Sequence, residues 1–153
     1  MPNLHIVIGD ANTKKSSLLR CLTGLAKSPI FRDVKLVNGA IIHVYCVSSA
    51  LQENFRPMTP TDFVQHVNSL NPSPTDIAIT LRTNGRGNYP SAQAYLTAFA
   101  NANYTIANVA ILGQSTAGLL QFANSVNVVV VQNSQIIPAN EVAAPVRSVW
   151  GWI

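Results

Sequence analysis

The sequence predicts an α/β fold in three layers, with a mostly parallel β-sheet covered by helices on both faces. Two observations predict it. Short apolar runs rich in β-branched residues alternate along the chain with segments whose apolar residues recur at helical spacing. The short runs are nearly continuously apolar, which is typical of parallel strands buried on both faces. No repeat or long linker divides the 153 residues, so we expect a single domain over residues 1–153.

The first part of the chain predicts a strand, a helix and a hairpin. Residues 4–8 form a short apolar run typical of a buried strand, and residues 16–25 carry apolar side chains on one helical face. Asn38-Gly39 separates the apolar runs 34–37 and 41–47, and an Asn-Gly pair between such runs favours a β-hairpin. This hairpin predicts one antiparallel strand at the edge of the sheet.

The remaining elements continue the alternation of strands and helices. We expect strands over 76–81, 106–112 and 126–131, and helices over 59–70, 91–103 and 116–124. Residues 136–153 are expected to form a C-terminal tail with a short helix around 140–150. The end of this tail, Trp150-Gly151-Trp152-Ile153, is apolar. It either docks on the chain's own sheet, which is the commoner outcome, or contacts a partner subunit.

The composition excludes intrinsic disorder, because 48% of the residues are apolar and only 10% are charged. The net charge of +4 lies in the first 35 residues, which hold six of the ten basic residues and two acids. Such a basic region attracts the phosphates of a nucleotide, a nucleic acid or a membrane, although a solvated helix face explains it equally well. Nucleic acid is the weakest of these partners, since Phe31 alone represents the aromatic residues among the charges.

The sequence gives no sign of a disulfide framework or a membrane span. Cys21 and Cys46 both lie in apolar runs and are interpreted as core residues. No run approaches the length of a membrane span, and the first residues lack the pattern of a signal peptide, so we expect a cytoplasmic protein. The three histidines are too far apart in sequence to predict a metal site.

The segment Gly9-Asp10-Ala11-Asn12-Thr13-Lys14-Lys15-Ser16 lies between the first strand and the first helix. It matches a P-loop at Gly9, Lys15 and Ser16, but Lys14 stands where the pattern has a second Gly. In a P-loop the Lys contacts the β- and γ-phosphates, the next hydroxyl binds Mg²⁺, and the helix N-terminus faces the phosphates. A basic turn without a ligand is the alternative. The candidate nucleotide-binding residues are Gly9, Asn12, Thr13, Lys14, Lys15, Ser16 and Ser17, with Ser16 also the candidate Mg²⁺ ligand.

Polar residues follow four of the predicted strands. Because ligands bind outside the carboxyl ends of parallel strands, these residues and the P-loop are expected to form one polar rim. Arg86, between Gly85 and Gly87 in a loop that these glycines let move, is the candidate phosphate-contacting Arg, although turns are often polar without a ligand. The four rim segments are Ser48-Ser49, 83–88, 114–116 and 132–134.

The order of elements, a strand, a P-loop, a helix, an antiparallel hairpin and a strand ending in a loop, resembles that of the small Ras-like GTPases from residue 4 to residue 131. The stretches Gly9-Asp10-Ala11-Asn12 and Lys15-Ser16-Ser17-Leu18-Leu19 are similar to the first motif of that family. The resemblance implies a three-layer α/β/α P-loop NTPase-like fold that binds a nucleoside triphosphate with Mg²⁺.

Several positions differ from the family pattern, which implies a degenerate member. Ser48 stands in place of the acid that holds Mg²⁺, and Leu51 in place of the Gly whose N–H contacts the γ-phosphate. Ala117 replaces the Asp that reads guanine, and residues 27–33 lack the Thr that closes over Mg²⁺. Gln52 does occupy the position of the water-orienting Gln, and is our candidate catalytic residue.

Two hypotheses follow for the function. The first is a nucleotide-binding protein of the GTPase-like class, with hydrolysis that is slow or absent because Mg²⁺ lacks its second protein ligand. The second is a pseudo-GTPase, an interaction module that no longer binds nucleotide. We expect a protein partner in addition to the nucleotide.

Overall fold

Six β-strands and four α-helices are found in the residues that the computed structural model describes, which are 1–53, 56–113 and 127–153. The expected helix over 116–124 lies outside these residues. In chain order the elements are β1 (Asn3–Gly9), α1 (Lys15–Thr23), β2 (Ile30–Lys35), β3 (Ile41–Ala50), α2 (Pro60–Ser69), β4 (Asp76–Arg82), α3 (Ala92–Asn101), β5 (Thr105–Leu112), β6 (Asn127–Val131), the 3₁₀ turn η2 (Ser134–Ile136) and α4 (Ala139–Trp150).

The strands form one sheet in the order β2-β3-β4-β1-β5-β6. Among the described strands, β2 is antiparallel to β3 and all other neighbours are parallel. This confirms the predicted α/β class, the mostly parallel sheet and the antiparallel edge strand from the hairpin. The order also places β4, the next strand along the chain after the hairpin, between β1 and β3, so the hairpin does not pair with β1 directly.

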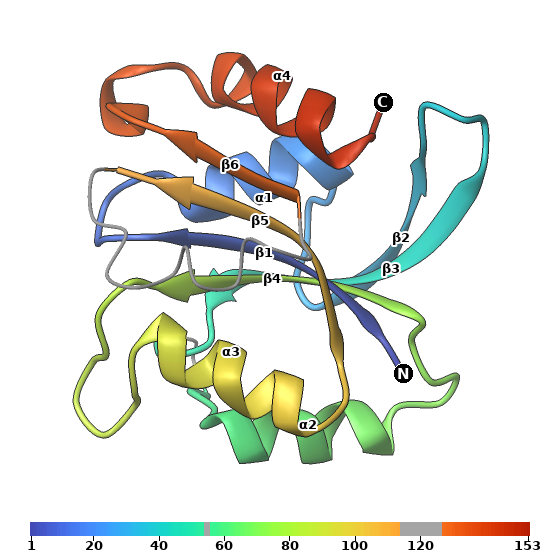
Figure 1. Cartoon of the computed structure of the whole chain (residues 1–153), viewed down its shortest axis with the longest axis vertical. Coiled ribbons are helices and arrows are strands. Elements are labelled where there is room, and N and C mark those ends of the chain that lie inside the picture. Colours follow the sequence, from blue (N-terminus) through green and yellow to red (C-terminus); the bar gives the residue numbers. More distant parts are fainter. Residues whose placement is uncertain (54–55, 114–126) are drawn as a thin grey trace.

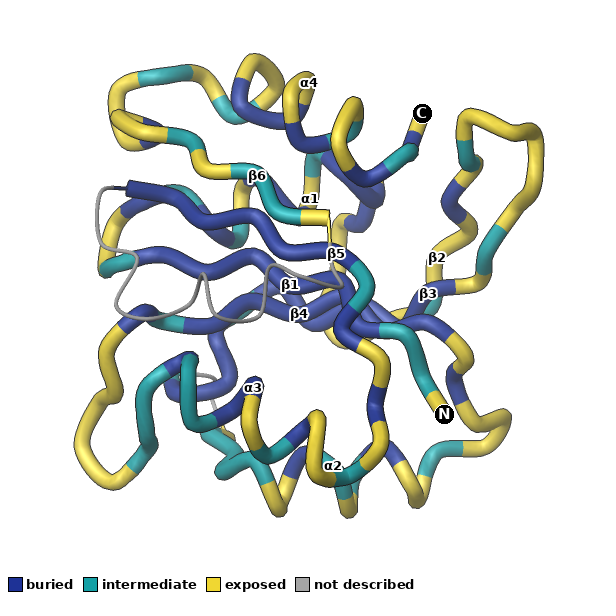
Figure 2. The backbone as a smooth tube through the Cα atoms, viewed as in Figure 1, coloured by how far each residue is buried: buried dark blue, intermediate teal, exposed yellow. Residues whose placement is uncertain are grey.

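Helices α2 and α3 cover one face of the sheet, and α1 and α4 cover the other (Figure 1). Side chains of β1 alternate between the two sides: Ile6 packs in the core under α2 and α3, whereas Val7 packs in the core under α1 and α4. Figure 2 shows β1, β4 and β5 buried along most of their length. Strands buried on both faces explain the continuous apolar runs in the sequence.

Local sequence signals explain most of the element ends. Thr59 and Asp62 form a reciprocal capping box at the start of α2, and Gly24 ends α1 in the left-handed conformation. The strand β2 begins at Ile30, four positions before the predicted run 34–37. Residues 30–33 include Arg32 and Asp33 and show no apolar run, but they pair with residues 43–46 of β3 and are therefore extended.

The C-terminal tail docks on the chain's own hairpin. Gly151 O accepts from Val37 N–H at 2.9 Å, and Ile153 N–H donates to Lys35 O at 2.9 Å. Trp150 and Trp152 are 4% and 2% exposed. Self-docking, the commoner of the two expected outcomes, is the arrangement found. No described helix is long and apolar enough to cross a membrane.

A row of polar side chains, buried at His5, Asp76 and Asn108 and exposed at Asn127, crosses the sheet near the amino ends of its strands. His5 Nε2 lies 2.9 Å from Asp76 Oδ1, Asn108 Nδ2 donates to His5 Nδ1 at 2.8 Å, and Asn127 donates to Asn108 at 2.9 Å. Burial by itself raises the pKa of Asp76, but the hydrogen bond and charge of His5, with weaker bonds from neighbouring residues, outweigh it and lower that pKa below its usual range.

We predict that Asp76→Asn lowers the free energy of unfolding by about 1–3 kcal/mol at neutral pH, because a buried charged acceptor is lost. The folded pKa of Asp76 is lower than the unfolded one, so its contribution is complete above about pH 4 and is lost as the pH falls below that value. Urea unfolding at pH 7 and pH 3 measures both effects. The exposed Asp33→Asn is the charge-matched control, and a pH dependence of Asp76→Asn equal to that of the wild type would contradict the prediction.

Candidate functional site

The segment that follows β1 folds back on its own first residues. Thr13 Oγ1 donates to Asp10 O at 2.8 Å. A Cβ atom at Gly9 would lie only 2.3 Å from Thr13 Oγ1 and 3.1 Å from Leu112, so the closed loop requires glycine at this position. Asn12 has a left-handed φ of 62°.

Lys14 adopts a left-handed backbone conformation, with φ 66° and ψ 32°. This is the conformation that glycine adopts without strain, and Lys14 stands where the P-loop pattern has glycine. The first bond of α1 runs from Leu18 N–H to Lys14 O at 2.9 Å. The N–H groups of residues 15–17 precede it and have no acceptor in the helix, which is the arrangement that binds anions at helix N-termini.

The side chain of Lys14 is engaged elsewhere. Its Nζ donates to Ile137 O at 3.0 Å, which ties the loop to the segment before α4. Ser134 Oγ makes a second tie by donating to Thr13 O at 2.9 Å. The expected assistance of Lys14 to phosphate binding stays a prediction, because its ammonium group already has a carbonyl partner.

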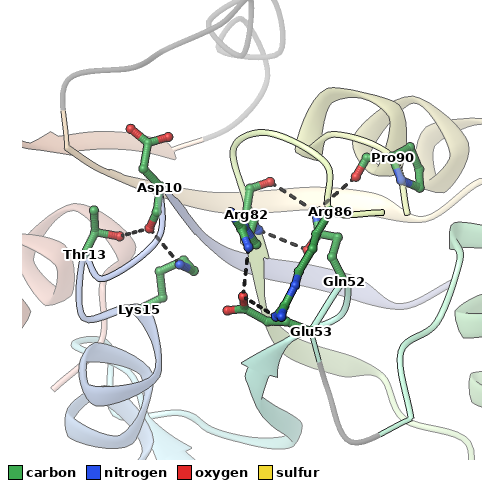
Figure 3. Close-up of polar contacts among 8 residues, drawn as sticks. All are labelled: Asp10, Thr13, Lys15, Gln52, Glu53, Arg82, Arg86 and Pro90. Carbon is green, nitrogen blue, oxygen red and sulfur yellow. Dashed lines mark hydrogen bonds and ion pairs between the residues drawn. The ribbon is translucent and has the colours of Figure 1, made fainter. Parts of the chain in front are cut away.

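Lys15 turns back over the loop (Figure 3), and its Nζ donates to Asp10 O at 2.9 Å. The residue is only 6% exposed. Burial lowers the pKa of Lys15, the charge of Glu53 opposes this, Arg82 adds to the lowering and Asp10 opposes it. The side chain therefore lies within electrostatic range of charged groups from the ends of both β3 and β4.

Ser16 and Ser17 complete the first turn of α1. Ser16 is half-buried and Ser17 is exposed. Ser16 directly follows Lys15 at the N-terminus of the helix, where a hydroxyl is placed to bind a metal ion held by phosphates.

Strand β4 brings its last residue against the end of β1. Arg82 pairs with Gly9, and Thr83 N–H donates to Gly9 O at 3.1 Å. Ser48, which the resemblance puts in place of a metal-holding acid, lies one strand further away on β3. It is 1% exposed, and its carbonyl accepts from Thr80 Oγ1 at 3.1 Å.

Gln52 lies between the end of β3 and the segment that joins β4 to α3. Its Nε2 donates to Arg82 O at 3.1 Å and to Pro90 O at 3.2 Å, and its Oε1 accepts from Arg82 N–H at 3.0 Å. The amide is 99% buried and makes all three bonds with backbone groups (Figure 3). A catalytic role for Gln52 stays a prediction. Its hydrogen bonds hold the backbone of Arg82 in place.

Arg86 lies in a tight turn between Gly85 and Gly87, and the expected mobility of this loop stays a prediction. Arg86 and Tyr89 exchange two backbone hydrogen bonds of 3.0 Å, and a Cβ at Gly85 would lie 2.4 Å from Tyr89 O. The guanidinium of Arg86 is 3.6 Å from Glu53 Oε2, and that of Arg82 is 3.4 Å from the same oxygen.

Several buried polar atoms at this end of the sheet have no hydrogen-bond partner among the described residues. They are Asp10 Oδ1, Ser48 Oγ, Arg82 Nε and Thr83 Oγ1. Buried polar groups are usually paired, so such a group of unpaired atoms indicates a place for water or a polar ligand.

Two cavities open at the same end. One, of about 510 Å³, is lined by Asp10, Ala11, Asn12, Thr13, Gly113, Asn133 and Gln135. The other, of about 470 Å³, is lined by Gln52, Glu53, Pro57, Arg86, Gly87, Asn88 and Tyr89.

The structure thus joins residues 9–17 to two of the four rim segments, those containing Thr83 and Ser134, whereas Ser48 lies on β3 with β4 between it and β1. Residues 114–116 and Ala117 lie outside the described residues. Sequence reasoning missed Arg82 and Glu53, because their proximity to Lys15 depends on the position of β4 in the sheet. A polar residue ending a buried strand is the signal that points to Arg82. The described residues contain no group of three or more His, Cys, Asp and Glu side chains arranged to bind a metal.

We predict that Lys14→Gly is more stable than Lys14→Ala by about 1 kcal/mol, because both variants lose the bond to Ile137 but only alanine keeps a Cβ in the left-handed conformation. Thermal and urea unfolding of the two variants measure the difference. A Lys14→Ala variant as stable as Lys14→Gly would contradict the left-handed turn.

Comparisons of this chain with protein-family models, with curated proteins and with solved structures found no match to any of them.

Proposed function

We propose that the protein binds a nucleoside triphosphate at residues 9–17, with hydrolysis that is slow or absent, as a degenerate P-loop NTPase resembling the small Ras-like GTPases. The observation that carries this proposal is the backbone of Lys14. Its φ of 66° gives the loop the turn that glycine supplies in the P-loop pattern, so the change of residue leaves the shape of the loop compatible with phosphate binding.

Three further features support a phosphate site. The N-terminus of α1 presents N–H groups with no acceptor in the helix, Lys15 turns over the loop, and the buried donor atoms Arg82 Nε and Thr83 Oγ1 lack partners among the described residues. Arg82 adds positive charge in range of Lys15, and Arg86 shares the carboxylate of Glu53 with Arg82. A triphosphate is the ligand whose charge this group matches best, despite the carboxylates of Asp10 and Glu53.

The oxygen donors at the site fit Mg²⁺, which prefers a few protein oxygens together with phosphate oxygens. Ser16 would hold the ion through its hydroxyl. When bound, Mg²⁺ would neutralise charge on the β- and γ-phosphates. Slow or absent hydrolysis agrees with the position of Gln52, whose amide is occupied by backbone groups.

The second candidate function is an interaction module that has lost its nucleotide. One observation favours it: the ammonium groups of Lys14 and Lys15 both have carbonyl partners within the chain, Ile137 O and Asp10 O. Nucleotide binding would have to replace the second of these bonds.

We predict that fluorescent analogues of ATP or GTP bind the wild type with a dissociation constant below 1 millimolar, and that Lys15→Ala weakens binding by about 10- to 100-fold through loss of a charge-assisted hydrogen bond. Fluorescence titration with Mg²⁺ present measures both values. Lys27→Ala, at an exposed Lys beyond the end of α1, is the control and should bind like the wild type. Absence of binding below 1 millimolar, with Lys15→Ala indistinguishable from the wild type, would favour the interaction module.

A further inference from the structure

The carboxylate of Glu53 lies between two guanidinium groups at the loop end of the sheet. Its Oε2 is 3.4 Å from Arg82 Nη1 and 3.6 Å from Arg86 Nη1 (Figure 3). The side chains of Glu53 and Arg82 are 28% and 23% exposed, so the pair is partly shielded from solvent. Glu53 also lines the cavity of about 470 Å³ beside Arg86.

Backbone hydrogen bonds fix the position of this cluster relative to the P-loop segment. Arg82 pairs with Gly9 of the neighbouring strand, and the side-chain amide of Gln52 hydrogen-bonds to both the N–H and the carbonyl of Arg82. Glu53 is the residue after Gln52, and Arg86 is held in its tight turn with Tyr89. The cluster is therefore part of the same rigid end of the sheet as the loop.

The cluster has more positive charge than its one carboxylate neutralises. Glu53 faces Arg82 and Arg86, and its charge also acts on Lys15. Both ion-pair distances exceed the roughly 2.7–2.9 Å of a strong charge-assisted hydrogen bond, and Arg82 Nε has no partner among the described residues. Glu53 is thus weakly held, and the guanidinium groups are free to accept a stronger anion.

We propose that Glu53 is a carboxylate that changes partners when nucleotide binds: it pairs with Arg82 and Arg86 in the free protein, and faces Mg²⁺ when the terminal phosphate takes these guanidinium groups. The inference rests on the proposed nucleotide binding. It adds Glu53 to Ser16 as the second residue whose oxygen faces Mg²⁺. Ser48 is buried on β3, with β4 between it and β1, and its hydroxyl carries no charge for this role. Glu53 is the acidic residue that follows β3.

This exchange makes the effect of Glu53 depend on the metal. Without Mg²⁺ its negative charge opposes a phosphate, and with Mg²⁺ it stabilises the complex. Glu53→Gln should therefore bind inorganic pyrophosphate and ATP about five- to tenfold more tightly than the wild type when Mg²⁺ is removed with EDTA, since a like charge is lost from a partly buried site. The same variant should lose most of the affinity that the wild type gains on adding Mg²⁺.

Isothermal titration calorimetry of the wild type and variants, with Mg²⁺ or with EDTA, measures these affinities. Asp33→Asn removes one negative charge from an exposed position of β2 and is the charge-matched control, expected to behave like the wild type. In EDTA, Arg86→Gln should bind pyrophosphate and ATP more weakly than the wild type, because one of the two guanidinium charges that offset the charge of Glu53 is lost. The Arg86 side chain is 60% exposed, so Arg86→Gln is expected to fold. This variant decides the test if Glu53→Gln does not fold.

Three results would overturn the inference. In the first, Glu53→Gln does not differ from Asp33→Asn in either condition. In the second, Glu53→Gln loses affinity in both conditions without losing stability, which would make Glu53 a positioning residue. The third result applies if Glu53→Gln does not fold: the inference is then overturned if Arg86→Gln binds in EDTA with the same affinity as the wild type. If the wild type binds neither pyrophosphate nor ATP with or without Mg²⁺, the proposed function falls together with the inference. If the wild type binds both, only the inference is at stake.

Discussion

The pairing of β4 with β1 is the constraint on which the candidate site depends. It joins Arg82 to Gly9 in register, and it places Thr83 N–H on Gly9 O. Because β4 lies between β1 and β3, the residues after β3 are connected to the loop through β4. Gln52 makes this connection with two hydrogen bonds to Arg82, and a third bond joins it to Pro90.

Burial and charge act against each other at Lys15. Lys15 is buried, and a buried ammonium group is costly unless it is paired. Here its one hydrogen bond is to a carbonyl, with two carboxylates in electrostatic range. The neighbouring Arg82 adds to the cost. A phosphate group would reduce this cost, since an anion beside Lys15 and Arg82 stabilises the charged form of Lys15 that burial disfavours. The same excess of positive charge explains why Glu53 lies between two guanidinium groups in the free chain.

Local sequence signals predicted the elements of the described residues, the mostly parallel sheet and its antiparallel edge strand, but gave no order for the strands. The apolar runs predicted the strands of the described residues, and Asn38-Gly39 predicted the hairpin, because these features depend on neighbours in the chain. The start of β2 was missed because Arg32 and Asp33 are extended by pairing with β3 rather than by their own pattern. The position of β4, and with it the roles of Arg82 and Glu53, depends on contacts between distant residues that no local pattern carries.

Lys14 shows how a residue with a Cβ holds a turn that glycine adopts without strain. A left-handed conformation costs a residue with a Cβ about 1–2 kcal/mol, and this chain offsets it with contacts from far along the sequence. Lys14 Nζ bonds to Ile137 O, 123 residues away, and Ser134 Oγ bonds to Thr13 O. The loop is therefore shaped by the C-terminal segment as well as by its own residues. A pattern that requires glycine at this position overlooks such a loop, since the backbone conformation, rather than the glycine itself, is what brings the N–H groups together.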